Sequence, residues 1–407
     1  MKYYYLFFVL SFFFLSCEKA VIDDENVIDE EMASEVDSDI SSYSSINSEY
    51  KDVDALKAIF TLGHASDVHS FNLKAVDNLN EFLSFFQRDN MAQRIDALVI
   101  TGDLCNGNAG RSKSQTIKEL QSVTEPVLKQ NIPTLLVVGN HDSNVNETRS
   151  NPAQDDNSYT RALTKREQYN YIIKDVKEKW NFINDLSEAC YYYTDFFPYK
   201  IRMICLDFID YPVIPNPNQS DKLNYNARHI FSQRQLEWFY KTLKSTPDDF
   251  GVIVAIHSIP GQENLYGKWM QGTNMMLRVV NAFKTGTQYK HDWDGGEYPE
   301  LATSVDFDFT GKGESEFICW IGGHTHYRIY TKEFDQLMIS TAALYTQYYD
   351  TMTDSRPRTY RQIDTDTQNS FNIMQVNREA KEVIVTVYGA YIDTQGSIAQ
   401  RTTKLSY

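Results

Sequence analysis

Five short polar motifs each follow a short apolar run, and this repeated arrangement constrains the fold more than any other feature of the sequence. The apolar runs cover residues 58–65, 97–100, 134–138, 252–256 and 317–321. Apolar runs of this length, rich in β-branched residues, are typical of buried strands. In an open α/β sheet, ligands bind outside the carboxyl ends of the strands. We therefore expect the five motifs to meet at one site.

The motifs contain side chains that bind metal ions. In chain order they are Asp67-Val68-His69, Gly102-Asp103, Gly139-Asn140-His141-Asp142, His257 and Gly323-His324-Thr325-His326. Imidazole and carboxylate ligands without cysteine suit manganese, iron or zinc. One tetrahedral site takes four ligands, so this larger set predicts two divalent transition-metal ions that share a carboxylate. Two such ions activate a bridging water as hydroxide and stabilise an in-line displacement, which favours a phosphate ester as the substrate.

In these motifs the chain resembles the calcineurin-like metallophosphoesterase superfamily, and the resemblance covers about residues 56–345. Asp-x-His alone is common by chance, but all five motifs in order are a specific signal. The resemblance implies that the first ion is bound by two carboxylates and two histidines: Asp67, His69, Asp103 and His326. It implies that the second ion is bound by the bridging carboxylate and three further side chains: Asp103, Asn140, His257 and His324.

The resemblance also assigns catalytic roles to residues that do not bind metal. His141 would protonate the leaving oxygen or stabilise the phosphoryl charge, and Asp142 would orient its ring. The purple acid phosphatase branch is disfavoured, because those enzymes have a tyrosine three residues after the bridging aspartate, where this chain has Asn106. They also lack the histidine that is present here as His69. His64, on the first apolar run, is interpreted as a packed, hydrogen-bonded strand residue.

The amino terminus predicts export. Lys2 precedes an apolar run over residues 3–15, and Ser16 and Cys17 follow. An apolar run of about 13 residues is too short for a stable transmembrane helix, so residues 1–16 are interpreted as a signal peptide. Ser16-Cys17 resembles a bacterial lipoprotein cleavage site, which implies that Cys17 carries the lipid anchor. We expect a membrane-anchored lipoprotein that faces the periplasm or the exterior; the alternative is ordinary secretion with a free Cys17.

An acidic tether is predicted over residues 17–54. Residues 18–54 carry 13 acidic residues and two lysines, a net charge of −11. Since Lys2 adds one positive charge, residues 55–407 carry −6 of the chain's total of −16. High charge and few aromatic residues are typical of disorder. We therefore expect a disordered linker between the anchor and the folded part.

Residues 55–407 are predicted to form one metallophosphoesterase domain, because the site needs motifs from both halves. Apolar residues recur at helical spacing over 73–86, 171–183 and 236–243, and at strand spacing in a C-terminal hairpin over 371–388. Ser232 and Gln235 have the spacing of a capping box before the third helix. Alternating strands and helices predict an α/β fold. Its expected architecture, which the resemblance also implies, is a four-layer sandwich of two packed mixed β-sheets flanked by helices.

The cysteines exclude some structural classes. Cys105, Cys190, Cys205 and Cys319 lack the CxxC spacing of a zinc knot. Two of them, Cys205 and Cys319, lie inside apolar runs, where free thiols behave as small apolar side chains. A disulfide scaffold is therefore excluded, while one disulfide stays open.

Several functions remain possible on this fold. A phosphodiester is favoured because the motifs have no nearby Lys or Arg except Arg328, and a monoester dianion needs more positive charge. A phosphomonoesterase is the first alternative, since residues 259–312 and 345–361 are predicted loops near the pocket. The second loop carries arginines that could bind a distal phosphate: Arg356, Arg358 and Arg361. The alternative for that loop is a solvated segment.

Two other functions are less compatible with the sequence. A nuclease usually has a basic patch, whereas residues 55–407 are mildly acidic, so no nucleic-acid partner is expected. A non-enzymatic surface-binding protein would be expected to lose a ligand or His141, and all are present. The oligomeric state stays open.

Overall fold

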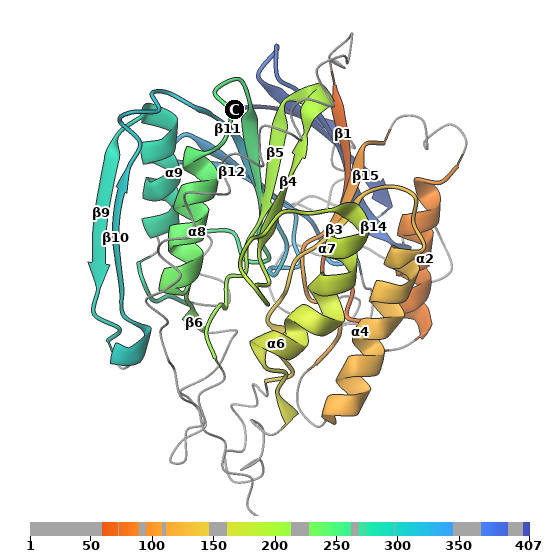
Figure 1. Cartoon of the computed structure of the whole chain (residues 1–407). Helices are drawn as coiled ribbons and strands as arrows, with labels where there is room; N and C mark the ends of the chain where they lie inside the picture. The colour runs from red at the N-terminus through yellow and green to blue at the C-terminus, as the bar shows by residue number, and fades with distance from the viewer. Residues whose placement is uncertain are drawn as a thin grey trace, which may run out of the picture. The chain divides into compact units, whose positions relative to one another are not determined.

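All five apolar runs form strands in two six-stranded mixed sheets (Figure 1). In the computed structural model, the first three runs form neighbouring strands of one sheet: β1 (Phe60–Ala65), β2 (Ala97–Ile100) and β3 (Thr134–Leu136). The last two runs form neighbouring strands of the other sheet: β7 (Gly251–Ala255) and β11 (Glu316–Gly322). Within each group the strands are parallel. The strand predictions are confirmed, and each motif begins at or just after the carboxyl end of its strand.

Three C-terminal strands complete the first sheet. They are β14 (Ser370–Asn377), β15 (Glu382–Gly389) and β16 (Thr402–Ser406). The order across the sheet is β16-β15-β14-β1-β2-β3, and β14 pairs with β1 antiparallel. The predicted hairpin is confirmed as β14 and β15. The sequence did not predict β16, whose exposed, polar residues gain strand structure by pairing with β15.

The second sheet combines a parallel centre with antiparallel edges. Its other strands are β4 (Tyr192–Phe196), β5 (Ile201–Cys205), β12 (Ile329–Glu333) and β13 (Gln336–Ser340). The order is β12-β13-β11-β7-β5-β4. Strands β13, β11, β7 and β5 run parallel, and β4 and β12 are antiparallel to their neighbours. The carboxyl ends of β7 and β11 therefore lie side by side.

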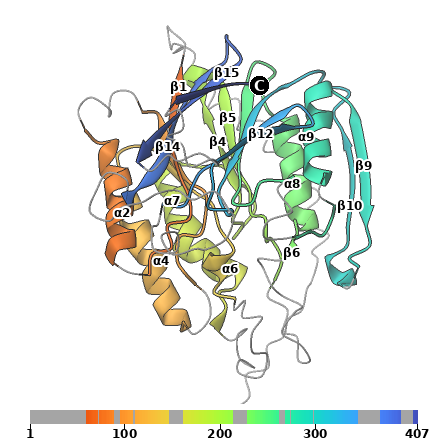
Figure 2. The same cartoon turned by 180° about the vertical axis from the view of Figure 1, so that it is seen from behind.

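Helices cover the outer face of each sheet. On the first sheet they are α2 (Leu73–Phe85), α4 (Lys113–Leu128), α6 (Lys165–Gln168) and α7 (Lys174–Trp180). On the second sheet they are α8 (Gln233–Lys244) and α9 (Met275–Thr285), with a hairpin of β9 (Gln288–Trp293) and β10 (Thr303–Asp308) beyond them. Figures 1 and 2 show these helix groups on opposite sides of the paired sheets from both directions. The predicted four-layer α/β fold is confirmed.

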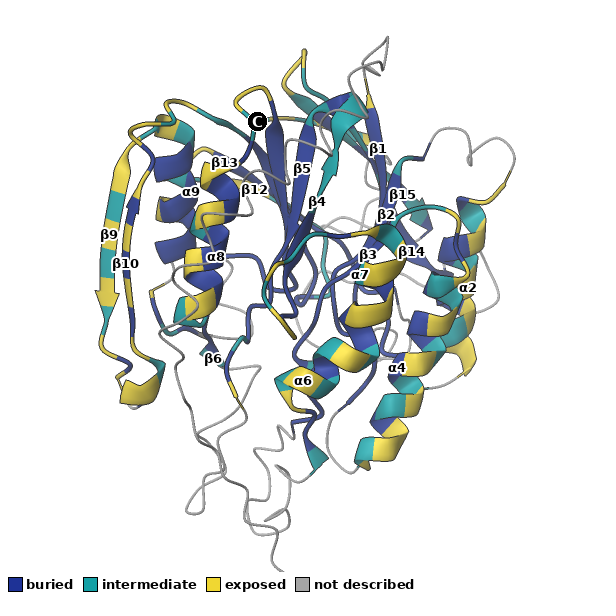
Figure 3. Cartoon of the chain, in the orientation of Figure 1, coloured by how far each residue is buried: buried dark blue, intermediate teal, exposed yellow. Residues whose placement is uncertain are grey.

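Alternate residues of the second sheet pack into two different cores. Cys205, Ile253 and Cys319 belong to the core that the two sheets share. Their neighbours along the strands, Ile204, Val254 and Trp320, pack in the core under α8 and α9. Figure 3 shows β5 buried along its length, in agreement with the burial of every residue of this strand. A strand that is apolar on both faces is what the continuous apolar runs indicate.

A tyrosine joins the two sheets close to the third motif. The Tyr192 hydroxyl on β4 accepts a hydrogen bond from the Leu136 amide at 2.9 Å and donates to the Leu136 carbonyl at 2.8 Å. Both residues are fully buried. Because Leu136 ends β3, this contact fixes the start of the loop that carries Asn140 and His141.

Three local predictions need correction. The segment over 259–312, predicted as a loop, contains α9 and the β9–β10 hairpin in its described part. The helix expected over residues 171–183 begins earlier, at Lys165 in α6, continues through a π-helical turn (Tyr169–Ile173) and ends with α7 at Trp180. Ser232 does cap α8 by accepting from the Gln235 amide. The Gln235 side chain does not complete a capping box, because it accepts from the Asp207 amide and donates to the Asp207 carbonyl. It ties α8 to the loop after β5 instead.

The structure describes residues 59–71, 73–88, 95–107, 111–145, 161–212, 228–261, 268–272, 274–296, 298–344, 368–389 and 402–407. The predicted signal peptide, Cys17, the tether and the loop over 345–361 lie outside these residues. Residues Ala55–Tyr407 form one compact unit. The four cysteines within the described ranges are buried and free.

Within the same ranges, no helix has both the length and the apolar character needed to cross a bilayer.

Two further short strands lie near the motif that follows β11. β6 (Arg228–His229) pairs in parallel with β8 (Lys268–Trp269). The ring of His229 packs edge-on against the ring of His324, with centroids 5.4 Å apart. This small sheet therefore packs, through His229, against the loop after β11.

Candidate metal centre

The seven predicted ligands lie in the loops that follow five strands. Those after β1, β2 and β3 are Asp67, His69, Asp103 and Asn140, and those after β7 and β11 are His257, His324 and His326. They form two clusters that share Asp103. The ligand atoms of the carboxylates and histidines within each cluster all lie within 4.8 Å of one another. The tertiary structure thus brings together residues separated by up to 259 positions in the sequence.

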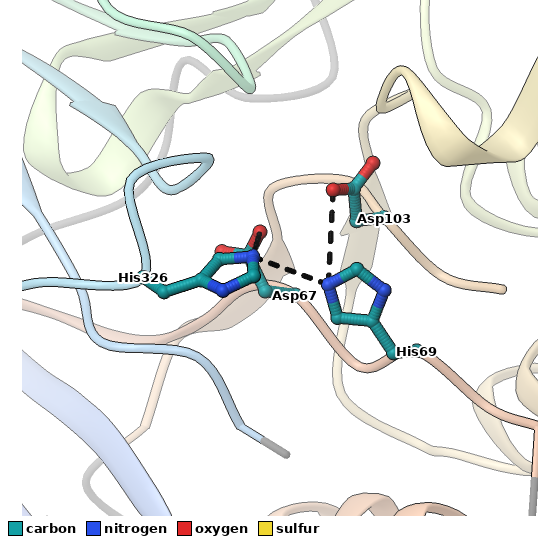
Figure 4. Close-up of side chains that lie close together, drawn as sticks. All are labelled: Asp67, His69, Asp103 and His326. Carbon is teal, nitrogen blue, oxygen red and sulfur yellow. Dashed lines mark hydrogen bonds and ion pairs between the residues drawn. The ribbon is translucent and has the colours of Figure 1, made fainter. Parts of the chain in front are cut away.

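The first cluster consists of Asp67, His69, Asp103 and His326. His326 Nε2 lies 3.1 Å from Asp67 Oδ1 and 3.2 Å from His69 Nε2. His69 Nε2 lies 3.8 Å from Asp103 Oδ2. Figure 4 shows the four side chains pointing toward one another from three loops. This geometry directs two nitrogens and two carboxylates at one point.

The second cluster consists of Asp103, Asn140, His257 and His324. His257 Nε2 lies 3.2 Å from Asp103 Oδ2 and 3.3 Å from His324 Nδ1. His324 Nδ1 lies 3.0 Å from Asn140 Oδ1. The same oxygen of Asp103 therefore faces both clusters, which is the position of a bridging ligand.

The donor chemistry fits two divalent metal ions. Ring nitrogens and carboxylate oxygens face one another in a buried space, and both kinds of atom coordinate divalent transition metals. The set contains nitrogen and oxygen only. Cys105, two residues after Asp103, instead donates its thiol to the His141 carbonyl at 3.6 Å. The seven residues would bind the two ions as the sequence predicts.

Electrostatics keep the two carboxylates ionised. Burial raises the pKa of Asp67, but the neighbouring rings, first His326 and then His257, outweigh burial and lower it to about 2. Burial likewise opposes ionisation of Asp103, and His257 and His141 bring its pKa well below the usual value. Two adjacent negative charges in a buried site favour a cation between them.

Burial and the carboxylates shift the pKa values of three histidines in different directions. Burial lowers the pKa of His69 to about 3 and that of His324 well below its usual value. Burial also acts to lower the pKa of His257, but Asp103 and Asp67 outweigh it and raise the value to about 9. A metal ligand must be deprotonated, so a bound cation would take the place of the His257 proton.

Most of the ligands have an unusual backbone conformation. Five of the seven have positive φ: Asp67 (54°), His69 (46°), Asp103 (50°), His324 (66°) and His326 (61°). The left-handed region costs a non-glycine residue about 1–2 kcal/mol. Hydrogen bonds between the loops hold these residues in place, such as Asp67 N to Gly102 O at 3.0 Å and His69 N to Asp103 O at 2.9 Å. Strained backbone of this kind is common at functional sites.

Two motif glycines allow the loops to pack closely. A Cβ atom on Gly139 would overlap the backbone of Asp103, and one on Gly323 would overlap Ser66 and Asp67. The glycines of the third and fifth motifs are therefore required by close approach of the loops to the ligands.

His141 lies at the rim of the site. Its Nε2 is 3.9 Å from Asp103 Oδ2, and its side chain is 15% exposed. Its Nδ1 lies 3.0 Å from the Asn106 carbonyl, and its backbone amide donates to Asp103 Oδ1 at 2.9 Å. The ring is thus held at one nitrogen by a carbonyl while the other nitrogen faces the cluster.

The orienting role predicted for Asp142 needs correction. Its carboxylate accepts hydrogen bonds from the backbone amides of Gly139 at 2.8 Å and Cys105 at 3.0 Å. Burial, followed by the charge of Asp103, raises the pKa of Asp142 to about 7. Asp142 therefore joins the loops after β2 and β3, and the Asn106 carbonyl takes the predicted position beside the His141 ring. A backbone carbonyl has no sequence signature, so this contact could not be predicted.

Comparison with known proteins gives a family match. A model of the calcineurin-like phosphoesterases matches residues 60–328. No curated protein matches the chain.

Solved structures similar to the chain include GAP50, the anchor in the inner membrane complex of Plasmodium. The two proteins are 12% identical, the alignment covers 86% of this chain and 89% of that chain, and the TM-score is 0.41. A conserved uncharacterised protein from Streptococcus pneumoniae TIGR4, described as a predicted phosphoesterase, has 9% identity, coverage of 86% and 99%, and a TM-score of 0.28. An archaeal phosphodiesterase has 12% identity, coverage of 81% and 99%, and a TM-score of 0.27.

The two clusters predict separable losses of metal. The reconstituted protein should bind two ions per chain. His69→Ala should remove the first and His257→Ala the second, while Asp103→Ala should remove both because both clusters share it. Elemental analysis after dialysis measures the stoichiometry, and the double variant of His69 and His257 should bind none. A wild-type content of one ion or none would contradict the dinuclear site.

Proposed function

Because this chain belongs to the calcineurin-like phosphoesterase family, we propose that it hydrolyses a phosphodiester in the cell envelope. It is a metal-dependent phosphoric ester hydrolase. The observation that carries the proposal is a pair of metal-ligand clusters sharing Asp103, with a histidine at the rim. The proposed ions are divalent transition metals, namely manganese, iron or zinc, in keeping with nitrogen and oxygen ligands.

The reaction divides between the metal ions and the protein's own side chains. When bound, two divalent ions supply Lewis acidity for the phosphoryl oxygens and lower the pKa of a water nucleophile. His141 supplies the proton for the leaving oxygen: its Nδ1–H donates to the Asn106 carbonyl, so the Nε2–H of the protonated ring points into the site. The carbonyl contact stabilises the protonated ring and fixes its direction. Asp142 stabilises the loops after β2 and β3 by accepting from the amides of Cys105 and Gly139.

Charge favours a diester over a monoester. A diester carries one negative charge, whereas a monoester is a dianion near neutral pH. Arg328 is the cationic residue nearest to the motifs in sequence, and its guanidinium donates to Ser370 on β14. Burial lowers the pKa of Arg328 to about 10. Arg111, at the start of the α4 region, pairs with Glu119 at 2.5 Å. Both cations are thus engaged by the protein, which supports a substrate with the smaller charge.

We expect hydrolysis of bis-p-nitrophenyl phosphate at least as efficient as that of p-nitrophenyl phosphate. The physical reason is that two metals and His141 can neutralise one phosphoryl charge and protonate an alkoxide leaving group. Both substrates should be assayed at matched metal loading. A kcat/KM that favours the monoester tenfold or more, about 1.4 kcal/mol of transition-state preference, would overturn the diester proposal. Loss of that preference in Arg356→Ala or Arg358→Ala would then assign the extra charge to the loop over residues 345–361.

His141→Ala should separate catalysis from metal binding. The ring is a proton donor beside the clusters, so its loss should lower kcat roughly 10²–10⁴-fold and leave two ions bound. Metal content and kcat are measured on the same preparation. His291→Ala, on β9 away from the clusters, is the matched control and should change neither. A parallel loss of metal and activity would place His141 among the ligands instead.

The envelope location rests on the amino-terminal sequence. We expect Cys17→Ser to block lipidation and to move the protein from the membrane fraction to the soluble or unprocessed fraction. The mass of the mature protein reports the acyl chains directly. Unchanged fractionation together with a mature mass that shows no lipid would mean ordinary secretion.

A further inference from the structure

His64 is a buried histidine of β1 that takes no part in either cluster. It has no exposed surface, and across the sheet it lies opposite Asn372 of β14. Its Nε2 lies 3.1 Å from the Thr101 hydroxyl. Thr101 follows β2 directly and is separated from the bridging Asp103 by one residue. His64 therefore contacts the loop that carries the bridging carboxylate from its buried side.

Thr101 connects His64 to a metal ligand. Its carbonyl accepts from His257 Nδ1 at 2.6 Å and from the Ser66 hydroxyl at 3.0 Å. Its amide donates to the Ala65 carbonyl at 2.9 Å, and its hydroxyl donates to the same carbonyl at 3.3 Å. The carbonyl has two lone pairs, so both are used. The Thr101 carbonyl that orients His257 therefore belongs to a residue whose amide and hydroxyl are also bonded.

The hydrogen positions follow from these contacts. The single hydroxyl proton of Thr101 is directed at Ala65, so the hydroxyl oxygen accepts from His64 Nε2–H. Burial, partly opposed by Asp67, lowers the pKa of His64 to about 3, so its ring is neutral and carries one proton. His257 then donates its Nδ1–H to Thr101 and presents Nε2 to Asp103 at 3.2 Å.

We propose that His64 and the Thr101 side chain are positioning residues for His257, and that they set the affinity of the second cluster for its ion. The inference rests on the proposed dinuclear function. An N–H to carbonyl hydrogen bond behind a metal-ligating histidine fixes its ring and raises its basicity, and its loss costs about 10–100-fold in metal affinity. His64 acts one contact further away by fixing the residue that supplies the carbonyl.

The effect should be selective for the second ion. In the first cluster, the Asp67 amide donates to the Gly102 carbonyl and the His69 amide donates to the Asp103 carbonyl. The first cluster is thus anchored to other peptide groups of the same loop. A general loss of packing around His64 would instead weaken both ions, because Asp103 belongs to both clusters.

Two matched pairs of variants test the proposal. Thr101→Val removes the hydroxyl at almost constant shape, and Thr101→Ser keeps it. His64→Asn places its amide too close to the backbone to reach Thr101, whereas His64→Gln places an amide nitrogen near the original Nε2. Within each pair, one variant loses the hydrogen bond between His64 and Thr101 and the other keeps it. Both His64 variants carry a polar amide, so they differ in reach and not in polarity.

The experiment measures binding of Mn²⁺ to the metal-free full chain. Calorimetry gives the dissociation constants, and the electron paramagnetic resonance signal reports the coupled ion pair. Thr101→Val and His64→Asn keep the carbonyl itself, so they should raise the dissociation constant of the second ion by about tenfold, the lower end of that range, and weaken the coupled signal, with the first ion changed less than about threefold. Thr101→Ser and His64→Gln should retain both ions. Thermal unfolding of the metal-free variants reports any change in the fold.

Equal weakening of both ions, unchanged binding in Thr101→Val, or failure of the conservative variants to retain the second ion would overturn the proposal. Should His64→Asn fail to fold, the Thr101 pair alone decides. A wild type that binds one ion would overturn it together with the dinuclear site. A wild type that binds two ions but hydrolyses no ester would refute the proposed function and leave the positioning role intact.

Discussion

The shared carboxylate of Asp103 is the interaction on which the rest of the site depends. One of its oxygens faces His69 of the first sheet and His257 of the second, and the other accepts the His141 amide. Burying such a charge is costly unless cations and hydrogen-bond donors compensate for it. The two sheets must therefore meet along their common core for the clusters to exist, and the Tyr192–Leu136 contact fixes that meeting beside the third motif.

The site also concentrates backbone strain. Five ligands lie in the left-handed region, which at about 1–2 kcal/mol each opposes folding by several kcal/mol. Hydrogen bonds between the loops and the surrounding buried strands offset this cost. Ions that bind only the folded chain would add stability by mass action. Backbone strain and metal binding thus have the same structural cause, because the sharp turns after the strands direct the ligand side chains at a common point.

Around the ligands, backbone carbonyls set the direction of the rings. The Asn106 carbonyl contacts His141 and the Thr101 carbonyl contacts His257. Asp142, by contrast, bonds to two backbone amides and stabilises the loops themselves. The residues closest in sequence to a catalytic histidine are therefore not the ones that orient it, because adjacent side chains in a tight turn point in different directions.

The sequence by itself determined the five strands that precede the motifs, the C-terminal hairpin, the ligand types and the fold class, because these follow from local apolar periodicity and from polar residues placed at strand ends. It could not determine the pairing of β16, which has little apolar character of its own and depends on β15. Nor could it determine which ring nitrogen faces the metals, or that His64 reaches His257 through Thr101. The contact of His257 joins residues 156 positions apart through a backbone carbonyl, a group that every residue possesses. Only the packing of the two sheets selects which of these groups meet.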